Sequence, residues 1–266
     1  MKISVVIPSF NDKRIIRTIK SIHNQDFPRG EYEIIVVDGG SCNDDFAGCL
    51  EFLRDNSDIF ISEKDKGIFD GLNKGIDIAK GELIFMIGSD DYLINKKAFN
   101  LAYSSFKEGN EITIFELFYV NQANIIERYW NLPKNMKKIP NHFQIPHFST
   151  FVSRKLIGTT KFDLNSYISA DFSFFKELLE RSISNHIINI PICCMTSGGQ
   201  SSKNFHNIVK GNIQSLKAFN YNFYQIFRFV LHKIQKKVIH LTILFFKKSN
   251  RIYYQKEIDK VLEDIS

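Results

Sequence analysis

The sequence lacks the signatures of several common protein classes. Its four cysteines, Cys42, Cys49, Cys193 and Cys194, form no CxxC pair, and an adjacent pair such as Cys193–Cys194 is poorly placed for a disulfide. This pattern predicts reduced thiols in a reducing compartment and argues against a zinc site. No GxGxxG follows the first predicted strand, which argues against a nicotinamide dinucleotide site. No GxxxxGK[ST] is present either, which disfavours a P-loop kinase.

Acidic residues are missing from a long C-terminal stretch. Between Glu180 and Glu257 there is no Asp or Glu, although this span carries 12 Lys and Arg. The rest of the chain has an acidic excess, whereas the whole chain has a net charge of +6. A basic tail on an acidic body indicates an anionic partner, such as a membrane surface or a nucleic acid. We place a boundary near Lys203–Asn207 and expect one main domain over 1–203 and a basic helical tail over 204–266.

Long apolar runs are also absent. The N-terminal MKISVVIPSF is broken by Pro8 and is too short for a signal peptide, so the catalytic part is expected in the cytoplasm. Residues 222–248 read NFYQIFRFVLHKIQKKVIHLTILFFKK, and no uncharged part of them is long enough to span a bilayer. Their mixture of apolar and basic residues predicts a helix lying in the interface of an anionic inner membrane. The alternative is a helical hairpin packed on the catalytic domain or on the partner in a homodimer.

The remaining pattern is that of an α/β domain. Strands are predicted at Lys2–Pro8, Tyr32–Val37, Ile59–Ser62, Glu82–Ile87, Ile112–Val120 and Ile125–Trp130, and helices after residue 12 and at Asp44–Asp55, Gly67–Lys80 and Asp171–Arg181. The early strands are continuous apolar runs rather than alternating ones, which indicates a mostly parallel sheet covered by helices on both faces. Asn11 or Asp12 is expected to cap the first helix.

Polar clusters follow four successive predicted strands. They are Pro8-Ser9-Phe10-Asn11, Asp38-Gly39-Gly40-Ser41, Lys64-Asp65-Lys66-Gly67 and Ser89-Asp90-Asp91. Ligands of parallel sheets bind at the carboxyl ends of the strands, so the recurrence predicts one shared site.

The Ser89-Asp90-Asp91 cluster points to a metal ion. Adjacent carboxylates after a buried strand are costly unless a cation or hydrogen-bond donors compensate them. Mg²⁺ or Mn²⁺ held by one carboxylate and two phosphate oxygens would do so, and would stabilise a departing diphosphate. A solvated Asp-Asp turn is the simpler alternative. Asp38 beside Gly39-Gly40 offers an acceptor for a ribose hydroxyl or a base N–H, next to backbone that a ligand can approach closely.

With these residues identified, the chain resembles the family 2 glycosyltransferases, which have the Rossmann-like GT-A fold, over about residues 1–200. The resemblance rests on SVVIPSFN, VVDGGSCND, EKDKGIFDGLNKGIDIAKGELIFMIGSDDYL, HFSTFVSRKLI and SADFSFFKEL followed by SGGQS. It implies a nucleotide-sugar half over about 1–110 and an acceptor half over about 111–203. Similar runs occur in bacterial polysaccharide and O-antigen glycosyltransferases.

The resemblance also implies donor-side roles. The nucleotide would be lined by Pro8, Ser9 and Asn11, with Asp38 and Gly39 on its uracil or ribose side. Lys64 and Asp65 would lie near the base and sugar, and Lys74 near the nucleotide or its phosphates. Ser89 and Asp90 would lie towards the ribose or donor sugar. Asp91 would be the direct metal ligand. Most family members have an Asp where this chain has Ser89. This difference affects the expected contact with the ribose and not the metal ligand.

On the acceptor side, Asp171 matches the position of the family's catalytic base. An inverting transfer needs one base to remove the acceptor hydroxyl proton. The alternative for Asp171 is a helix N-cap. His147 matches a family histidine that approaches the diphosphate or metal, although a packed histidine is an equally simple interpretation. Trp130, the only tryptophan, would stack on an acceptor sugar or pack in the core, and 198–201 would close over the site or form a plain turn.

These inferences predict an inverting, Mn²⁺- or Mg²⁺-dependent glycosyltransferase. It would move a hexose from a UDP-sugar to a saccharide on a polyprenyl diphosphate carrier during synthesis of bacterial surface polysaccharide, at the cytoplasmic face of the inner membrane. One alternative is a sugar-phosphate nucleotidyltransferase, but PSFNDKR does not supply the Gly- and Arg-rich loop of those enzymes. The other is a non-enzymatic membrane- or nucleic-acid-binding protein. Nucleic acid is not an expected partner.

Overall fold

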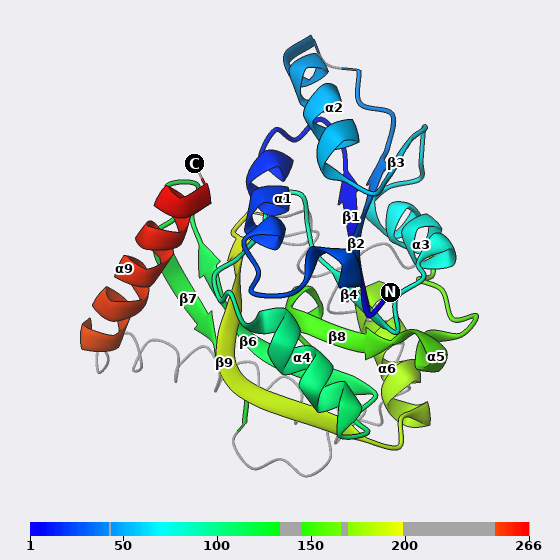
Figure 1. Cartoon of the computed structure of the whole chain (residues 1–266), viewed down its shortest axis with the longest axis vertical. Helices are drawn as coiled ribbons and strands as arrows, with labels where there is room; N and C mark the ends of the chain where they lie inside the picture. Colours follow the sequence, from blue (N-terminus) through cyan, green and yellow to red (C-terminus); the bar gives the residue numbers. More distant parts are fainter. Residues whose placement is uncertain (43, 134–144, 166–169, 199–247, 266) are drawn as a thin grey trace, which may run out of the picture.

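One nine-stranded sheet organises the chain (Figure 1). The computed structural model describes residues 1–42, 44–133, 145–165, 170–198 and 248–265. The strands are β1 (Ile3–Ser9), β2 (Tyr32–Asp38), β3 (Ile59–Ser62), β4 (Leu83–Met86), β5 (Tyr92–Leu93), β6 (Ile112–Val120), β7 (Ile126–Trp130), β8 (Thr150–Ser153) and β9 (Asn185–Thr196). The helices are α1 (Ile15–His23), α2 (Asp44–Asn56), α3 (Ile68–Ile78), α4 (Ala98–Lys107), α5 (Arg154–Ile157), α6 (Ala170–Arg181) and α9 (Lys248–Ile265), with short 3₁₀ turns η1 (Arg29–Glu31) and η2 (His147–Ser149).

The strands follow the order β3-β2-β1-β4-β8-β6-β9-β5, with β7 added beside β6. The first four pair in parallel, and their register places Ser9 opposite Asp38 and Asp38 opposite Ser62. Every residue of β1 and β2 is buried, as expected for strands covered on both faces. The polar residues that end these strands therefore lie together at the carboxyl ends of the parallel strands.

The second half of the sheet is mixed. β8 runs antiparallel to both β4 and β6, β9 runs parallel to β6, and β5 and β7 are antiparallel to their neighbours. The strands predicted at 112–120 and 125–130 are confirmed, whereas β9 was not predicted. Pro191 interrupts its sequence, and the structure absorbs this residue because the β6–β9 register shifts on both sides of Glu116.

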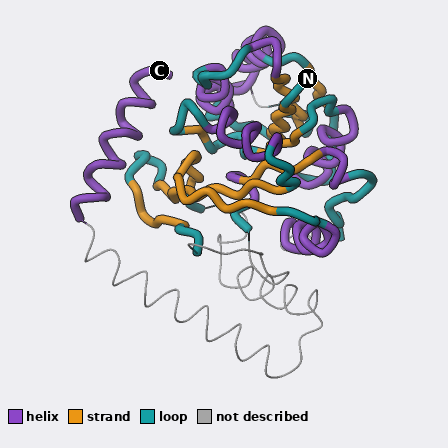
Figure 2. Tube along the Cα trace, turned by 60° about the horizontal axis from the view of Figure 1, so that its bottom comes forward, coloured by secondary structure: helices purple, strands orange, loops and turns teal. Residues whose placement is uncertain are grey.

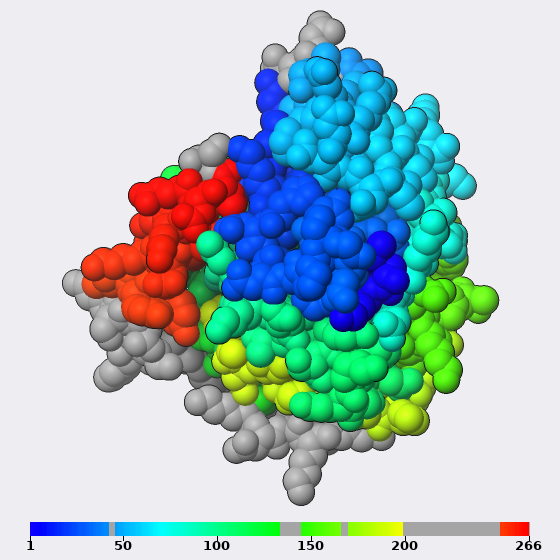
Figure 3. Space-filling model, viewed as in Figure 1, coloured from blue at the N-terminus to red at the C-terminus, as the bar shows by residue number. Residues whose placement is uncertain are grey.

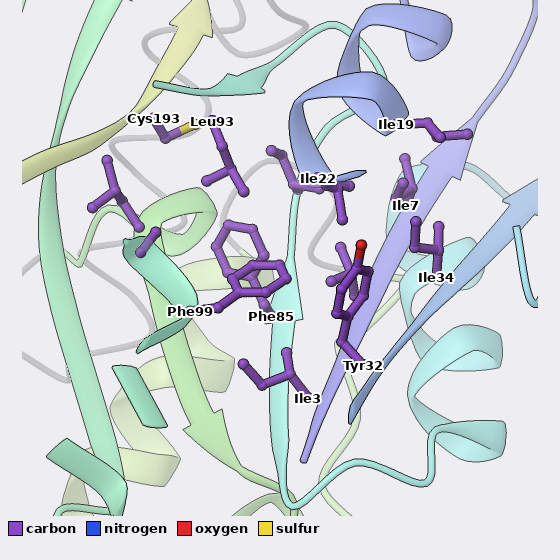
Figure 4. Packing of buried hydrophobic residues seen from close by; sticks show 14 of the residues in the cluster. Ile3, Ile7, Ile19, Ile22, Tyr32, Ile34, Phe85, Leu93, Phe99 and Cys193 are labelled. Carbon is purple, nitrogen blue, oxygen red and sulfur yellow. The ribbon is translucent and has the colours of Figure 1, made fainter. Parts of the chain in front are cut away.

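Helices cover both faces of the sheet, and a hydrophobic core lies under each layer. The core shown in Figure 4 joins α1, α2 and α4 to the sheet through buried residues such as Ile19, Phe85 and Phe99. The core on the other face joins α3, α5 and α6 through Leu72, Ile157 and Phe174. The expected α/β fold with helices on both faces is thus confirmed.

The predicted cap of α1 is wrong. The residue before the helix is Arg14, which makes no side-chain capping bond, and Asp12 accepts from the Arg14 backbone N–H at 3.0 Å. Asn11 adopts a left-handed φ of 51° and bonds to the loop after β2. The two polar residues therefore shape the loop between β1 and α1.

The C-terminal helix α9 lies at one side of the molecule (Figure 2). Ile258 packs against Tyr92 and Phe118, and Lys96 pairs with Asp264 at 3.1 Å. In the space-filling view this helix, coloured red, lies beside the blue N-terminal segment that contains α1 (Figure 3). Among the described residues no helix is both long and apolar enough to cross a membrane. The predicted boundary near 203 and the segment 204–247 lie outside the described residues.

Candidate active site

Asp38, at the end of β2, is fully buried and organises the loop that follows it. Its Oδ1 accepts from the Ser41 hydroxyl at 2.5 Å, and its Oδ2 accepts from the Ser41 backbone N–H at 2.9 Å and from the Ser62 hydroxyl at 2.7 Å. Ser41 Oγ in turn accepts from the Asn11 backbone N–H at 2.7 Å. The Asp38 carboxylate thus connects the loops after β1 and β2, which are two of the four predicted polar clusters, to the end of β3.

Ser9 and Pro8 close the end of β1 beside this loop. The Ser9 side chain is 5% exposed, and its hydroxyl has no hydrogen-bond partner within the described structure. The Ser9 carbonyl accepts from the Gly39 backbone N–H at 2.8 Å. A buried hydroxyl without a partner is costly, so Ser9 offers a donor and an acceptor to a ligand at this strand end.

Two glycines make room for Asp65. A Cβ on Gly39 would lie 2.9 Å from Asp65 Oδ2, and one on Gly71 would lie 3.5 Å from the same oxygen and 3.2 Å from Pro8 Cβ. Asp65 Oδ1 also accepts from the Gly67 backbone N–H at 2.8 Å. The carboxylate therefore sits directly over the backbone that follows Asp38, and the predicted neighbours Gly39 and Asp65 are in contact.

The two predicted lysines are placed differently. Lys64 is exposed, and its backbone packs beside Gly40, whose φ is +81°. Lys74, on α3, pairs with Glu63 at 2.7 Å and with Asp70 at 3.6 Å. The hydrogen bond to Glu63 is the largest cause that raises the pKa of Lys74. Lys74 therefore stays charged but is held by carboxylates of this chain.

Asp91 carries the least compensated carboxylate of the region. It is 1% exposed, and its Oδ1 accepts from the Thr196 backbone N–H at 2.9 Å. Its Oδ2 has no partner among the described residues and lies where a Cβ on Gly88 would be 2.7 Å away. Burial, reinforced by the neighbouring charge of Asp90, raises the pKa of Asp91 well above its usual range.

The backbone around Asp91 is fixed by α1 and β9. Thr18 Oγ1 donates to the carbonyl oxygens of Ser89 at 2.9 Å and Asp91 at 2.6 Å, and Thr196 Oγ1 donates to that of Asp90 at 2.7 Å. The Asp90 carboxylate lies 3.5 Å from Arg14 Nη1. Burial raises the pKa of Asp90, and Arg14 opposes that shift. Ser89, Asp90 and Asp91 are therefore a rigid turn and not a freely solvated one.

The donor set suits a hard divalent ion shared with a ligand. Within the described ranges, no group of three or more His, Cys, Asp or Glu is arranged to hold a metal. One buried carboxylate oxygen without a partner, next to a second carboxylate, nevertheless fits an ion whose other ligands are phosphate oxygens and water. These residues fit Mg²⁺ or Mn²⁺ only when a diphosphate supplies the remaining ligands.

Asp171 and His147 form a second part of the site. Asp171 is in the first turn of α6, and its Oδ2 lies 3.3 Å from Nδ1 of His147 in η2. Burial is the larger influence on His147 and lowers its pKa, while Asp171 acts in the opposite direction. His147 was predicted to approach the metal, and the structure places it against the predicted base. Residues 199–201, most of the predicted closing segment, lie outside the described residues.

Sequence reasoning missed Arg17 and its partners. Arg17 Nη2 donates to the Asp90 carbonyl at 2.8 Å, its Nη1 donates to Asn124 Oδ1 at 2.7 Å, and its guanidinium lies 4.2 Å from the Tyr92 ring centroid. Gln255 of α9 donates to the Asn124 carbonyl at 3.0 Å. Arg17 and Gln255 are 238 positions apart in the sequence, and no local pattern predicts that Asn124 connects them.

Together, the fold brings the acidic strand-end loops to the carboxyl end of the parallel strands, and a separate carboxylate–histidine pair joins η2 to α6. The sequence model described as Glycosyl transferase family 2 matches residues 4–182, well over half of the chain. The chain therefore belongs to this family. The resemblance noted in the sequence is confirmed.

Known relatives support this assignment. Chondroitin synthase of Escherichia coli is 26% identical over 196 residues, which cover 71% of this chain and 28% of that protein. The poly(ribitol-phosphate) beta-N-acetylglucosaminyltransferase TarS of Staphylococcus aureus is 33% identical over 130 residues, which cover 47% of this chain and 22% of TarS. The chain thus spans about a quarter of the length of these two relatives.

Solved structures confirm the GT-A fold. TarS residues 1–349 in complex with UDP-GlcNAc superpose with a TM-score of 0.65 and 17% identity, covering 100% of this chain and 82% of that one. The mannosyltransferase PcManGT of Pyrobaculum calidifontis, in complex with GDP-Man and Mn²⁺, superposes with a TM-score of 0.58 and 13% identity. The match covers 81% of this chain and 64% of PcManGT.

Proposed function

We propose that this glycosyltransferase transfers a hexose, with inversion, from a UDP-sugar to a saccharide acceptor, and that the reaction requires Mn²⁺ or Mg²⁺. The observation that carries the proposal is the Asp91 carboxylate. It lies in the turn between the buried strands β4 and β5, has one oxygen without a partner in the described structure, and has its pKa raised by burial and by Asp90. A cation bound with a diphosphate would pair with the free oxygen and would offset the cost of burying the charged carboxylate.

The donor would lie along the carboxyl ends of β1, β2 and β4. The Asp38 network fixes the loops that would enclose the nucleoside, Ser9 would contribute its hydroxyl, and Asp65 over Gly39 would accept from the base or sugar. Asp90 would face the ribose or donor sugar. The UDP-GlcNAc complex of TarS, which has the same fold, supports a UDP-sugar donor.

Asp91 would hold the metal ion, and Asp90 would lie beside it. When bound, the ion would act as a Lewis acid that stabilises the negative charge of the departing diphosphate. The cations Arg14 and Arg17 stand close to the same turn and would limit repulsion between the carboxylates. The Mn²⁺ in the complex of PcManGT supports this choice of ion.

Asp171 would act as the base that removes the acceptor hydroxyl proton while the anomeric carbon is attacked. His147 would orient Asp171, because a buried, neutral imidazole can donate one hydrogen bond from Nδ1 to the carboxylate. This interpretation gives His147 a positioning role in place of metal ligation. The tautomer follows from the contact, since the carboxylate can only accept.

The acceptor would be a growing or carrier-linked bacterial surface polysaccharide. Chondroitin synthase and TarS are both named as enzymes of polymer synthesis or modification. We further propose that the basic stretch between Glu180 and Glu257 brings the enzyme to the cytoplasmic face of the inner membrane, where polyprenyl diphosphate-linked saccharides would be available. Binding to anionic but not to neutral vesicles, at moderate salt, tests that location.

Donor hydrolysis tests the class of reaction. Purified protein is incubated with Mn²⁺ and a panel of UDP-, GDP- and TDP-sugars, and the released nucleotide is quantified. One UDP-sugar should be hydrolysed, and chelation should stop the reaction. Release of pyrophosphate from UTP plus a sugar 1-phosphate would instead identify a nucleotidyltransferase and would refute the proposal.

A further inference from the structure

The β6–β7 hairpin carries a stack of three side chains that the donor site does not use. Tyr119 and Arg128 are cross-strand partners, and Trp130 lies two residues beyond Arg128 on the same face of β7. The Arg128 guanidinium is 3.7 Å from the centroid of the Tyr119 ring and 5.9 Å from that of Trp130. The two rings are nearly parallel, at 14°, with centroids 6.0 Å apart.

This stack lies beside the active site. Tyr119 pairs with Met195 in β9, the residue before Thr196, and the Thr196 backbone N–H holds Asp91. Burial raises the pKa of Tyr119 to about 12, Arg128 opposes the shift, and the charges of Asp91 and Asp171 add to it. The strand register therefore places Tyr119 next to the β9 backbone that holds the acidic turn.

The charge of Arg128 is available to a ligand. Arg14, Arg29 and Arg181 each pair with an Asp or Glu, whereas Arg128 is exposed and has no salt bridge within the described residues. Stacking on an aromatic face holds a guanidinium in a fixed plane while its N–H groups still point outward. A guanidinium fixed in this way matches the geometry of phosphate oxygens.

Trp130 adds a second unused donor. Its indole Nε1 is buried and has no hydrogen-bond partner in the described part of the chain. An orphaned indole N–H is costly, and an incoming phosphate or hydroxyl oxygen would satisfy it if the stack opened slightly. The stack thus combines a fixed cation, a protonated phenol and an unpartnered N–H on one hairpin.

We propose that Tyr119, Arg128 and Trp130 form an acceptor subsite that binds a phosphate group of the acceptor. The proposal rests on the proposed function and names its acceptor class as a phosphate-bearing saccharide or polyol. Two sources share that chemistry, namely the diphosphate of a lipid carrier and the phosphodiester of a polyol-phosphate polymer. The subsite would hold either anion beside the hydroxyl that Asp171 deprotonates.

The single tryptophan supplies a direct probe, because Trp130 is the only one in the chain. Emission is recorded with saturating UDP and excess Mn²⁺, so that the diphosphate site is filled, while geranyl diphosphate, ribitol 5-phosphate or neutral ribitol is added. A saturable change is expected with at least one phosphate and not with ribitol. Geranyl diphosphate alone would identify the lipid carrier, and ribitol 5-phosphate alone would identify the polymer.

Matched arginine variants complete the test. Arg128→Gln should weaken phosphate binding roughly tenfold or more, since a charge-assisted bidentate contact is lost. The phosphate affinity of Arg128→Lys should lie between those of the wild type and Arg128→Gln. Arg54→Gln is the control, because Arg54 is also exposed and lies 5.8 Å from the Phe60 ring at the far edge of the sheet. UDP-sugar hydrolysis without acceptor should be equal in all four proteins.

No emission change with either phosphate, or wild-type binding in Arg128→Gln, would overturn the subsite. Failure of every protein to hydrolyse any UDP-sugar would refute the proposed function instead. The two failures are therefore distinguishable, because the emission titration requires no turnover.

Discussion

His147 Nδ1 lies 3.3 Å from Oδ2 of Asp171, and this contact joins η2 to the first turn of α6. Burial lowers the pKa of His147, so at neutral pH the contact is between a neutral ring and the carboxylate and is not an ion pair. The contact fixes one oxygen of the Asp171 carboxylate. The relationship makes His147 a positioning residue for the proposed base.

Removing this contact should slow the chemical step. His147→Ala is expected to lower kcat about 10- to 100-fold, a range typical of losing a group that orients a catalytic residue. His147→Asn should retain much of the activity, since its amide N–H can occupy the place of Nδ1. Neither variant should change the Mn²⁺ concentration for half-maximal rate, and a large change would restore the metal-ligand role. His23→Gln, at the end of α1, is the control.

The same histidine gives a dependence of stability on pH. Its pKa is lowered from 6.5 in the folded state, so its contribution is present above pH 6.5 and is lost as the pH falls through the folded value. The Tm of the wild type should therefore fall more steeply below pH 6.5 than that of His147→Asn. Thermal melts between pH 5 and 8, at constant ionic strength, provide the measurement. Parallel curves would contradict a neutral His147.

Asp91 should destabilise the metal-free protein. Its pKa is raised in the folded state from 3.8, so its stabilising contribution is complete only below pH 3.8 and is lost as the pH rises through the folded value. Asp91→Asn should raise the Tm at pH 7 by roughly 2–4 °C, which corresponds to about 1 kcal/mol for a domain of this size. The difference should shrink towards pH 4. A lower Tm for Asp91→Asn at pH 7 would contradict the burial argument.

A methyl group on Gly39 should disturb the nucleotide loops. The added Cβ would lie 2.9 Å from Asp65 Oδ2, so Gly39→Ala must displace that carboxylate. UDP affinity is expected to fall about tenfold, equivalent to about 1.4 kcal/mol. Gly48→Ala in α2 is the matched control, because nothing lies within 4 Å of its added Cβ. Equal UDP affinity in the two variants would remove Asp65 from the donor site.

The C-terminal helix should influence the acidic turn through Gln255. This side chain binds the Asn124 carbonyl and accepts from the Ile126 backbone N–H at 3.0 Å, while Asn124 Oδ1 accepts from Arg17, which holds the Asp90 carbonyl. Gln255→Ala is expected to lower kcat/KM for the donor by about three- to tenfold at unchanged Tm within about 2 °C. Lys260→Ala, on the same helix, serves as the control. A lower Tm with an unchanged kcat/KM for the donor would mean that the helix has only a structural role.

The sequence predicted most of the sheet and the candidate site because both depend on local signals. Continuous apolar runs marked β1 and β2, and polar residues at the strand ends marked Asp38, Asp65 and Asp91. The sequence did not predict β9, since Pro191 breaks its pattern and only the bulge opposite Glu116 accommodates that residue. The Arg17–Asn124–Gln255 contacts were equally inaccessible, because long-range pairing leaves no periodicity in a single sequence.

Calorimetric titration of UDP in the presence and absence of Mn²⁺ tests the metal-assisted donor site most directly. The wild type should bind UDP at least tenfold more tightly with Mn²⁺, equivalent to about 1.4 kcal/mol or more. Asp91→Asn should lose this gain, and Asp171→Asn should keep it while abolishing transfer. UDP binding that is independent of Mn²⁺, or a full gain in Asp91→Asn, would contradict the assignment of Asp91 and with it the proposed mechanism.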